Sequence, residues 1–151
     1  MSSTNKKIAI IGGGVAGLLA AVTAADAGAK VSLFEKMPKV GLKMGITGKG
    51  RCNLTNSAPI MDFIGKTPGN GKFLYSAYEA FSNEDLLDLL HSYGLVTKVE
   101  RGGRVFPASD DAQEVRHLFM KLLRDKKVDL HLEEPVSHIV VIDGEAKGVV
   151  T

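Results

Sequence analysis

A glycine-rich stretch and a later glutamate are the first residues whose types and spacing suggest chemistry. The stretch Gly12–Gly17, with the sequence GGGVAG, fits the pattern G-x-G-x-x-G. In this pattern the first glycine permits a tight turn, the second lets a pyrophosphate approach the main chain, and the third allows a helix and a strand to pack closely. Glu35 follows about 20 positions later, the usual spacing of the acidic residue that binds ribose hydroxyl groups. Together these residues predict a dinucleotide-binding site, with the pyrophosphate at the N-terminus of a helix.

The predicted contacts of this site are Gly12, Gly14, Val15, Ala16, Gly17 and Glu35. A glutamate at the ribose accepts hydrogen bonds from the hydroxyl groups and repels a 2′-phosphate, which disfavours NADP and leaves NAD or FAD. The alternative interpretation is a glycine-rich turn that serves packing alone, followed by a solvated glutamate at the end of a strand.

A second glycine-rich stretch follows at residues 41–56, with the sequence GLKMGITGKGRCNLTN. Its glycines let main-chain amides turn toward a ligand, as in the anion-binding segments called nests. Lysine and arginine side chains add positive charge, and threonine and asparagine side chains add neutral hydrogen-bonding groups. The residues concerned are Gly41, Lys43, Gly45, Thr47, Gly48, Lys49, Gly50, Arg51, Asn53, Thr55 and Asn56. Two polar segments so close together predict a long ligand with phosphates at one end and a hydrogen-bonding ring at the other, a description that fits FAD better than NAD.

The elements around these residues are predicted from their hydrophobic patterns. Lys6–Ile11 is a short β-branched run, typical of a strand buried on both faces in a parallel sheet. Val15–Ala27 has helical periodicity and ends before Gly28, and Lys30–Phe34 is a second strand. The order strand, glycine turn, helix, strand forms one βαβ unit with a right-handed crossover.

The rest of the chain alternates between helices and short strands. Ser82 and Asp85 predict the capped start of a helix that stops at Gly94. Asp110 predicts the start of another helix, which runs to about Lys127. Hairpins are predicted within residues 95–106 and 136–151. A third parallel strand is predicted at residues 128–132. The predicted fold class is α/β: a Rossmann-like FAD-binding βαβ domain whose parallel sheet is incomplete, with helical and β-hairpin insertions.

The predicted organisation is the N-terminal part of an FAD/NAD(P)-binding domain in a longer protein, because the strand-like end of the sequence would leave an apolar sheet edge open. Residues 1–40 form the βαβ nucleotide unit, 41–56 the flavin-side loop, 57–127 a mainly helical insertion with a hairpin, and 128–151 the third strand and the start of a β-meander.

The two glycine-rich stretches and a later segment resemble a family of bacterial FAD-dependent oxidoreductases described as BaiN-like or aminoacetone-oxidase-like. The resemblance rests on GGGVAG, on Glu35 and Lys36 after the second strand, on the T-G-x-G-R-C-N-x-T-N pattern at residues 47–56, and on an E-x-x-G-R-x-F-P pattern at residues 100–107. It covers essentially the whole sequence, whereas full-length members of that family are considerably longer.

The resemblance implies functions for further residues. Lys36 would lie along the adenosine end of FAD, and Val136 would touch the adenine through its main chain. The residues on the path to the flavin would be Lys43, Thr47, Arg51, Cys52, Asn53 and Asn56. The implied activity passes hydride between FAD and an unidentified small organic substrate, with NAD(P)H as a candidate electron donor.

Composition and charge argue against several other classes of protein. The 151 residues carry a formal net charge of +2, which gives no overall field for nucleic acid or an anionic membrane. The uncharged run after Lys7 is interrupted by glycines, so we expect no membrane span. Cys52 is the one cysteine and has no disulfide partner within the chain, and the four histidines lack metal-ligand spacing. We therefore expect a cytoplasmic protein with no metal site and no nucleic-acid partner, in which Cys52 is a packing residue.

Two other functions are compatible with the same residues. An NAD-dependent dehydrogenase would use the βαβ unit for NAD and residues 41–56 for its substrate. A flavin-binding RNA-modifying protein would use the cations of that stretch on RNA. No catalytic acid or base can be named from the sequence, because in flavoenzymes the cofactor performs the redox chemistry while protein groups orient the substrate. The sequence also leaves the substrate, the reaction direction and the oligomeric state open.

Overall fold

The computed structural model describes residues 6–151, and these residues form two compact units. The first unit comprises the chain up to Gly45 together with Arg116–Thr151, and the second comprises Ile46–Val115. Each unit has its own sheet and its own core, and each is described separately below.

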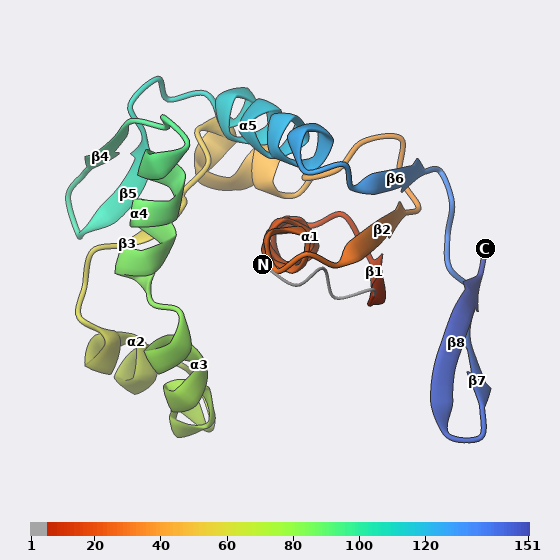
Figure 1. Ribbon diagram of the computed structural model, residues 1–151. Coiled ribbons are helices and arrows are strands. Elements are labelled where there is room, and N and C mark those ends of the chain that lie inside the picture. The colour runs from red at the N-terminus through yellow and green to blue at the C-terminus, as the bar shows by residue number, and fades with distance from the viewer. Residues whose placement is uncertain (1–5) are drawn as a thin grey trace. The chain divides into compact units, whose positions relative to one another are not determined.

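The first unit is built on a three-stranded parallel sheet in the order β1-β2-β6 (Figure 1). The strands are β1 (Lys7–Ile11), β2 (Lys30–Glu35) and β6 (Asp129–Leu132). In their register Ile10 lies opposite Leu33, and Leu33 lies opposite Leu130. Helix α1 (Val15–Asp26) connects β1 to β2 and packs on both of these strands (Figure 1). The Rossmann-like α/β fold class predicted from the sequence is therefore confirmed.

The core of this unit lies between α1 and the sheet. Leu18 and Val22 of the helix are buried, as are Val31 and Leu33 of β2. Alanines elsewhere on the helix let its backbone approach the strands closely, and they favour the helical conformation. The helix ends as predicted, because Gly28 adopts φ +85° just after the last turn.

One expectation for β1 is wrong. Its apolar sequence predicted burial on both faces, yet the side chains of Ile8 and Ile11 are 37% and 51% exposed. Within residues 6–151, β1 pairs with β2 along one edge only and lies at the end of the sheet. An apolar strand is buried on both faces only when a layer covers each face, and here α1 supplies one layer.

A hairpin follows the parallel sheet in the first unit. It consists of β7 (His138–Ile142) and β8 (Glu145–Val150), which pair antiparallel with a bulge between Val140 and Val141. Asp143 and Gly144 form its turn, both with positive φ, as a type I′ hairpin turn requires. This hairpin was predicted from the Asp-Gly pair.

The second unit holds a three-stranded antiparallel sheet in the order β3-β5-β4 and several helices. Its strands are β3 (Thr55–Asn56), β4 (Thr97–Val99) and β5 (Arg104–Pro107). Its helices are α2 (Ile60–Lys66), η2 (Gly71–Leu74), α3 (Tyr75–Ala80) and α4 (Asn83–Ser92). Helix η1 (Met44–Gly50) and helix α5 (Ala112–Asp125) each continue across a boundary between the two units. Val105, Phe106, Leu90 and Leu95 are buried in this unit.

The two predicted helix starts have different outcomes. For α4 the prediction is confirmed: Ser82 accepts a hydrogen bond from the Asp85 amide, and the Asp85 carboxylate accepts one from the Ser82 amide. For α5 the prediction is wrong by one position, because Asp111 rather than Asp110 accepts the hydrogen bond from the amide of Gln113. Asp110 has φ +58° and binds two cations of its own unit instead.

No helix within residues 6–151 combines the length and the apolar character needed to cross a lipid bilayer.

Candidate nucleotide-binding site

The glycine turn between β1 and α1 has the geometry that the sequence pattern requires. Gly12 adopts φ +101°, a conformation that L side chains rarely adopt, and its amide donates to the carbonyl of Phe34 at 2.7 Å. A Cβ atom on Gly17 would lie 1.9 Å from the carbonyl oxygen of Gly12. The third glycine of the pattern is therefore required by the close packing of helix and turn, as predicted.

The helix N-terminus at this turn is open to a ligand. Gly14 is the N-cap of α1, and a Cβ atom built on it would meet nothing within 4 Å. The first helical turn contains no acidic side chain and no side-chain cap. Main-chain amides at the start of a helix favour an anion, both as hydrogen-bond donors and through the helix dipole. This end of α1 thus fits a pyrophosphate group.

Glu35 is joined directly to the glycine turn. Its Oε2 accepts a hydrogen bond from the amide of Gly13 at 2.7 Å, and its Oε1 accepts one from the amide of Met37 at 2.8 Å. A carboxylate has about four acceptor positions, so each oxygen of Glu35 can also accept a hydrogen bond from a ribose hydroxyl. The carboxylate therefore fixes the turn and keeps acceptor capacity for a nucleotide.

The start of the second glycine-rich stretch lies against the same turn. The amide of Gly41 donates to the carbonyl of Gly13 at 2.8 Å, and Val40 is buried with its Cγ1 atom 2.6 Å from the position of a Cβ on Gly13. Gly13 therefore binds Glu35 through its amide and Gly41 through its carbonyl. Sequence reasoning missed this residue because it occupies the unspecified position of the G-x-G pattern. The signal that could have revealed it is that this position is itself a glycine.

The first unit also contains Lys36 and Val136, which are predicted at the adenosine end, and Lys43, which is predicted on the path to the flavin. Lys36 and Lys43 are exposed, and Val136 lies between β6 and β7. The amide of Glu134, two positions before Val136, donates to the carbonyl of Glu35 at 3.1 Å. The segment that contains Val136 thus starts beside Glu35, the residue predicted to bind the ribose. The adenine contact of Val136 stays a prediction.

The part of the second stretch that lies in the second unit has an unusual backbone. Gly48, Lys49, Gly50 and Cys52 all have positive φ. A left-handed conformation at a residue other than glycine costs roughly 1 kcal/mol or more and is concentrated at ligand sites and switches. The amides of Arg51 and Cys52 donate within the stretch, to the carbonyls of Gly48 and Thr47 at 3.4 and 3.1 Å. Binding of a ligand by main-chain amides of residues 41–56 stays a prediction.

Arg51 has protein partners in the second unit. Its Nη1 donates to Glu100 Oε1 at 2.7 Å and to Asp110 Oδ1 at 3.4 Å, and its Nη2 donates to Glu100 Oε2 at 3.3 Å. The guanidinium carbon lies 4.2 Å from the centre of the Phe106 ring. The hydrogen bond and charge of Glu100 raise the pKa of Arg51, against a smaller opposing effect of burial. The predicted role of Arg51 on the path to the flavin stays a prediction.

Asn53 and Asn56 also bind the protein itself. The side-chain amide of Asn53, in the orientation that its hydrogen bonds require, donates to the main-chain carbonyls of Val105 and Thr55 at 3.2 and 3.0 Å. The side chain of Asn56 donates to the carbonyl of Gly102 at 2.7 Å. Both side chains attach the second stretch to the β4–β5 hairpin, and their predicted flavin contacts stay predictions.

Cys52 is buried, with 2% of its surface exposed. Burial raises the pKa of its thiol, and a hydrogen bond with Thr47 opposes that rise. A thiol with a raised pKa is a poor nucleophile at neutral pH. These properties fit the predicted packing role, and the predicted contacts of Thr47, Gly50 and Cys52 with a flavin stay predictions.

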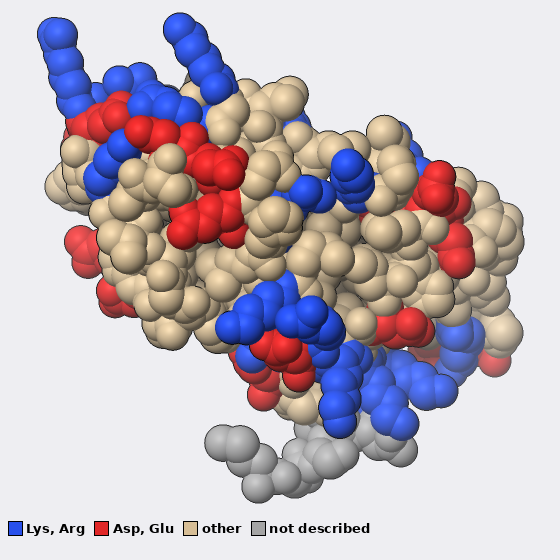
Figure 2. All heavy atoms as spheres, turned by 90° about the horizontal axis from the view of Figure 1, so that it is seen from above, with Lys and Arg blue, Asp and Glu red and all other residues tan. Residues whose placement is uncertain are grey.

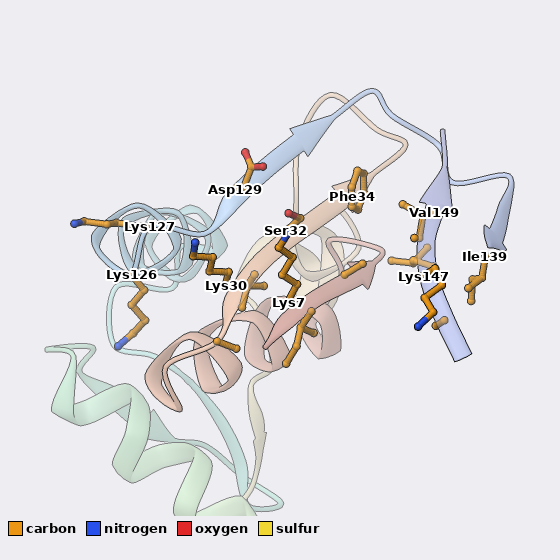
Figure 3. Close-up of a pocket in the computed structure, with 17 residues that line it drawn as sticks. Lys7, Lys30, Ser32, Phe34, Lys126, Lys127, Asp129, Ile139, Lys147 and Val149 are labelled. Carbon is orange, nitrogen blue, oxygen red and sulfur yellow. The ribbon is translucent and has the colours of Figure 1, made fainter. Parts of the chain in front are cut away.

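A separate pocket of about 950 Å³ lies on the sheet of the first unit, between β1, β2 and the β7–β8 hairpin (Figure 3). Lysines and aliphatic side chains line much of it, among them Lys7, Lys30, Lys126, Lys127, Lys147, Ile8 and Ile139. Neither the glycine turn nor Glu35 lines this pocket. The candidate nucleotide site is therefore distinct from this pocket. Because the glycine turn follows β1 and Glu35 ends β2, the site lies at the carboxyl end of the strands, where open α/β sheets bind ligands.

The parallel sheet, the glycine turn and the glutamate at the end of β2 define a nucleotide-binding domain of the Rossmann type. The chain belongs to the HI0933-like family, since the HI0933-like protein Rossmann domain matches residues 6–151. The resemblance to BaiN-like and aminoacetone-oxidase-like oxidoreductases is thereby confirmed.

Several curated proteins are similar to this chain over most of its length. The 3-dehydro-bile acid delta(4,6)-reductase of Clostridium scindens is 40% identical over 130 residues, which are 83% of this chain and 30% of the reductase. The ribosomal RNA dihydrouridine synthase of Escherichia coli is 30% identical over 132 residues, which are 84% of this chain and 31% of the synthase. The chain thus spans about a third of the length of the curated relatives it matches.

Solved structures confirm the fold. The THI4 protein of Thermovibrio ammonificans superposes with a TM-score of 0.63 at 16% identity, covering 96% of this chain and 45% of THI4. The L-proline dehydrogenase of P. horikoshii superposes with a TM-score of 0.51 at 14% identity, covering 99% of this chain and 49% of the dehydrogenase.

Proposed function

We propose that the protein is an FAD-dependent oxidoreductase that passes hydride between the flavin and an organic substrate. The observation that carries this proposal is the hydrogen bond from the Gly13 amide to the Glu35 carboxylate, at 2.7 Å. It holds a ribose-binding group at a fixed position beside an uncapped helix N-terminus, the two features that a dinucleotide needs. Family membership supports FAD as that dinucleotide.

In this proposal the residues of the chain bind and orient the cofactor. The amides at Gly12, Gly14, Val15, Ala16 and Gly17 receive the pyrophosphate, and Glu35 accepts hydrogen bonds from the ribose. Lys36 and Val136 lie along the adenosine. The flavin-side contacts are Lys43, Thr47, Gly50, Arg51, Cys52, Asn53 and Asn56. Bound FAD supplies the hydride chemistry itself. The domain organisation predicted from the sequence, an N-terminal part of a longer FAD-binding domain, is part of the same proposal.

The curated relatives support reduction as the direction of the reaction. The names of the Clostridium scindens and Escherichia coli relatives both describe the addition of hydrogen, to a bile-acid derivative in one case and to uridine in the other. We propose that this protein likewise reduces a substrate with an unsaturated bond, with NADH or NADPH as the electron donor. The substrate is a small organic molecule in the first version of this function.

A second version, in which the substrate is RNA, is favoured by the ribosomal RNA dihydrouridine synthases of Escherichia coli and Haemophilus influenzae, which are 30% and 27% identical to this chain. Charge gives it little support, because acidic side chains lie beside most of the basic clusters on the face seen in Figure 2. RNA binding through phosphates would weaken steeply as salt increases. A gel shift with ribosomal RNA fragments at several salt concentrations therefore separates the two versions.

The direct test is an absorption spectrum of the purified full-length protein, followed by identification of the cofactor released on denaturation. The proposal predicts a yellow protein that releases FAD and whose flavin is bleached anaerobically by NADH or NADPH. A colourless protein that binds NAD and no flavin would overturn it in favour of an NAD-dependent dehydrogenase.

A further inference from the structure

His131 on β6 lies between two carboxylates. Its Nε2 atom is 3.0 Å from Asp129 Oδ2, and its Nδ1 atom is 3.4 Å from Glu134 Oε2. Neutral imidazole has one donor nitrogen and one acceptor nitrogen, whereas imidazolium has two donors. Only the protonated ring can therefore donate to both carboxylates at the same time.

The His131 ring is held in place by Phe34 of β2. The two rings stack with their centres 4.5 Å apart and an angle of 13° between their planes. Phe34 lines the pocket of the first unit (Figure 3), and its carbonyl accepts the hydrogen bond from Gly12 in the glycine turn. The histidine therefore rests on the residue that joins β2 to the predicted pyrophosphate site.

Glu134 connects His131 to the predicted ribose site. Its side chain faces the imidazole, and its amide donates to the carbonyl of Glu35 at 3.1 Å. The neighbouring amide of Glu133 donates to the carbonyl of Met37 at a longer distance of 3.3 Å. These contacts attach the first two residues of the segment 133–136 to the end of β2 and to Met37 just after it.

We propose that His131 is a positioning residue for the nucleotide site, which holds the segment 133–136 against β2 through Glu134 when its ring is protonated. The inference rests on the proposed function, because the bound nucleotide is the group that the segment would face. The substrate reaction needs no proton from His131 in this account. The residue acts only through Glu134 and the main chain beside Glu35.

The charges around the ring determine the direction of the pH effect. Asp129 on β6 and Glu134 in the following loop face the imidazole, and the side chain packed on it from β2, Phe34, carries no charge. Burial disfavours the charged ring, but the two carboxylates together raise the pKa of His131 above the ordinary value. The contribution of the protonated ring to this attachment is therefore complete at acid pH and is lost as the pH rises through this raised pKa. The main-chain hydrogen bonds of Glu133 and Glu134 remain at every pH.

The test is a titration of the cofactor-free full-length protein with FAD, followed by flavin fluorescence, at intervals between about pH 5.5 and pH 9. The wild type is expected to bind FAD about two- to fivefold more tightly at the acid end, the range that a partly exposed ion pair supplies. The His131→Gln variant is expected to keep the weaker affinity at every pH. Glu134→Gln is expected to behave in the same way, and it retains the imidazole and its stacking. His91→Gln, in the second unit, is the matched control and is expected to keep the wild-type profile.

The possible outcomes separate this inference from the proposed function. Absence of FAD binding at every pH would overturn both. FAD binding whose pH profile is the same in wild type, His131→Gln and Glu134→Gln would overturn the positioning role alone. An NMR titration of the His131 ring gives an independent readout in the absence of FAD. Its midpoint is expected to fall in Glu134→Gln, and an unchanged midpoint would contradict the pairing.

Discussion

Arg51 Nη1 donates to Glu100 Oε1 at 2.7 Å and thereby joins two segments that are 49 positions apart in the sequence. One segment is the second glycine-rich stretch, and the other is the E-x-x-G-R-x-F-P pattern at residues 100–107. The same segments also pair as strands, Thr55 with Val105 and Asn56 with Arg104. The two patterns are therefore one structural element of the second unit, joined by an ion pair and by strand pairing.

The ion pair of Arg51 and Glu100 predicts that substitutions at these two residues have strongly coupled effects on stability. Arg51→Lys keeps the positive charge but loses the bidentate hydrogen bonds to Glu100. Glu100→Gln removes the negative charge of the acceptor. Each single variant is expected to lower the thermal midpoint by a few degrees. The double variant is expected to lose clearly less than the sum of the two single losses. Thermal unfolding followed by circular dichroism measures all four proteins.

The exposed pair of Lys66 and Asp62 on α2, 3.2 Å apart, serves as the control cycle and is expected to show almost no coupling. Additive losses in the thermal midpoint for the Arg51 and Glu100 variants would contradict a stabilising ion pair between these residues.

Asp110 predicts a loss of stability at acid pH. The hydrogen bond and charge of Lys98, with a further contribution from Arg51, lower the pKa of Asp110 below its ordinary value of 3.8. Its stabilising effect is therefore complete above that value and is lost as the pH falls through the lowered pKa. Asp110→Asn is expected to be less stable than wild type at pH 7, and to lose less on further acidification from about pH 4 to pH 2. Urea unfolding across this range is the measurement, and an identical acid dependence in the variant would refute the assignment.

Gly17 and Gly14 are expected to respond differently to alanine. A Cβ atom on Gly17 would lie 1.9 Å from the carbonyl oxygen of Gly12, so Gly17→Ala should destabilise the fold by roughly 2 kcal/mol or more. Gly14→Ala meets nothing within 4 Å in the protein and should cost at most about 1 kcal/mol at this cap position. We nevertheless expect Gly14→Ala to abolish FAD binding, because the added methyl group would occupy the space of the pyrophosphate.

Chemical denaturation and FAD titration of both variants provide this comparison. A Gly14→Ala protein that binds FAD like wild type would show that the pyrophosphate lies elsewhere.

Cys52 is expected to react slowly with a thiol reagent in the native protein. Its thiol is buried and its pKa is raised by that burial, so both access and thiolate content are low. Modification by an aromatic disulfide reagent at pH 7.5 should be at least about tenfold slower than in guanidinium chloride. Cys52→Ala should retain the proposed oxidoreductase activity of the full-length protein. Rapid native modification, or complete loss of activity in a folded Cys52→Ala variant, would indicate a chemical role for the thiol.

The sequence predicted those parts of the fold that depend on local patterns. The βαβ unit followed from the apolar periodicity of residues 6–34 and from glycines whose positive φ is visible in the structure, such as Gly12 and Gly28. The capping box of Ser82 and Asp85 is likewise a local signal and was predicted correctly.

The errors and omissions involve partners that are distant in the sequence. The sequence did not reveal that Arg51 binds Glu100, because this partner comes from a hairpin much later in the chain. The apolar sequence of β1 predicted burial, but burial depends on the neighbours of a strand and not on its own residues. Asp110 and Asp111 both suit a helix start, and contacts with Lys98 and Arg51 engage the first of them elsewhere.

We propose that the turn at Gly12–Gly17 and the carboxylate of Glu35 bind one dinucleotide together. Hydrogen exchange of the full-length protein, with and without FAD, tests this claim most directly, because it locates the bound cofactor on the main chain. We predict slower exchange at residues 12–17 and 35–41 when FAD is present. Slower exchange elsewhere, with both of these segments unchanged, would contradict the claim.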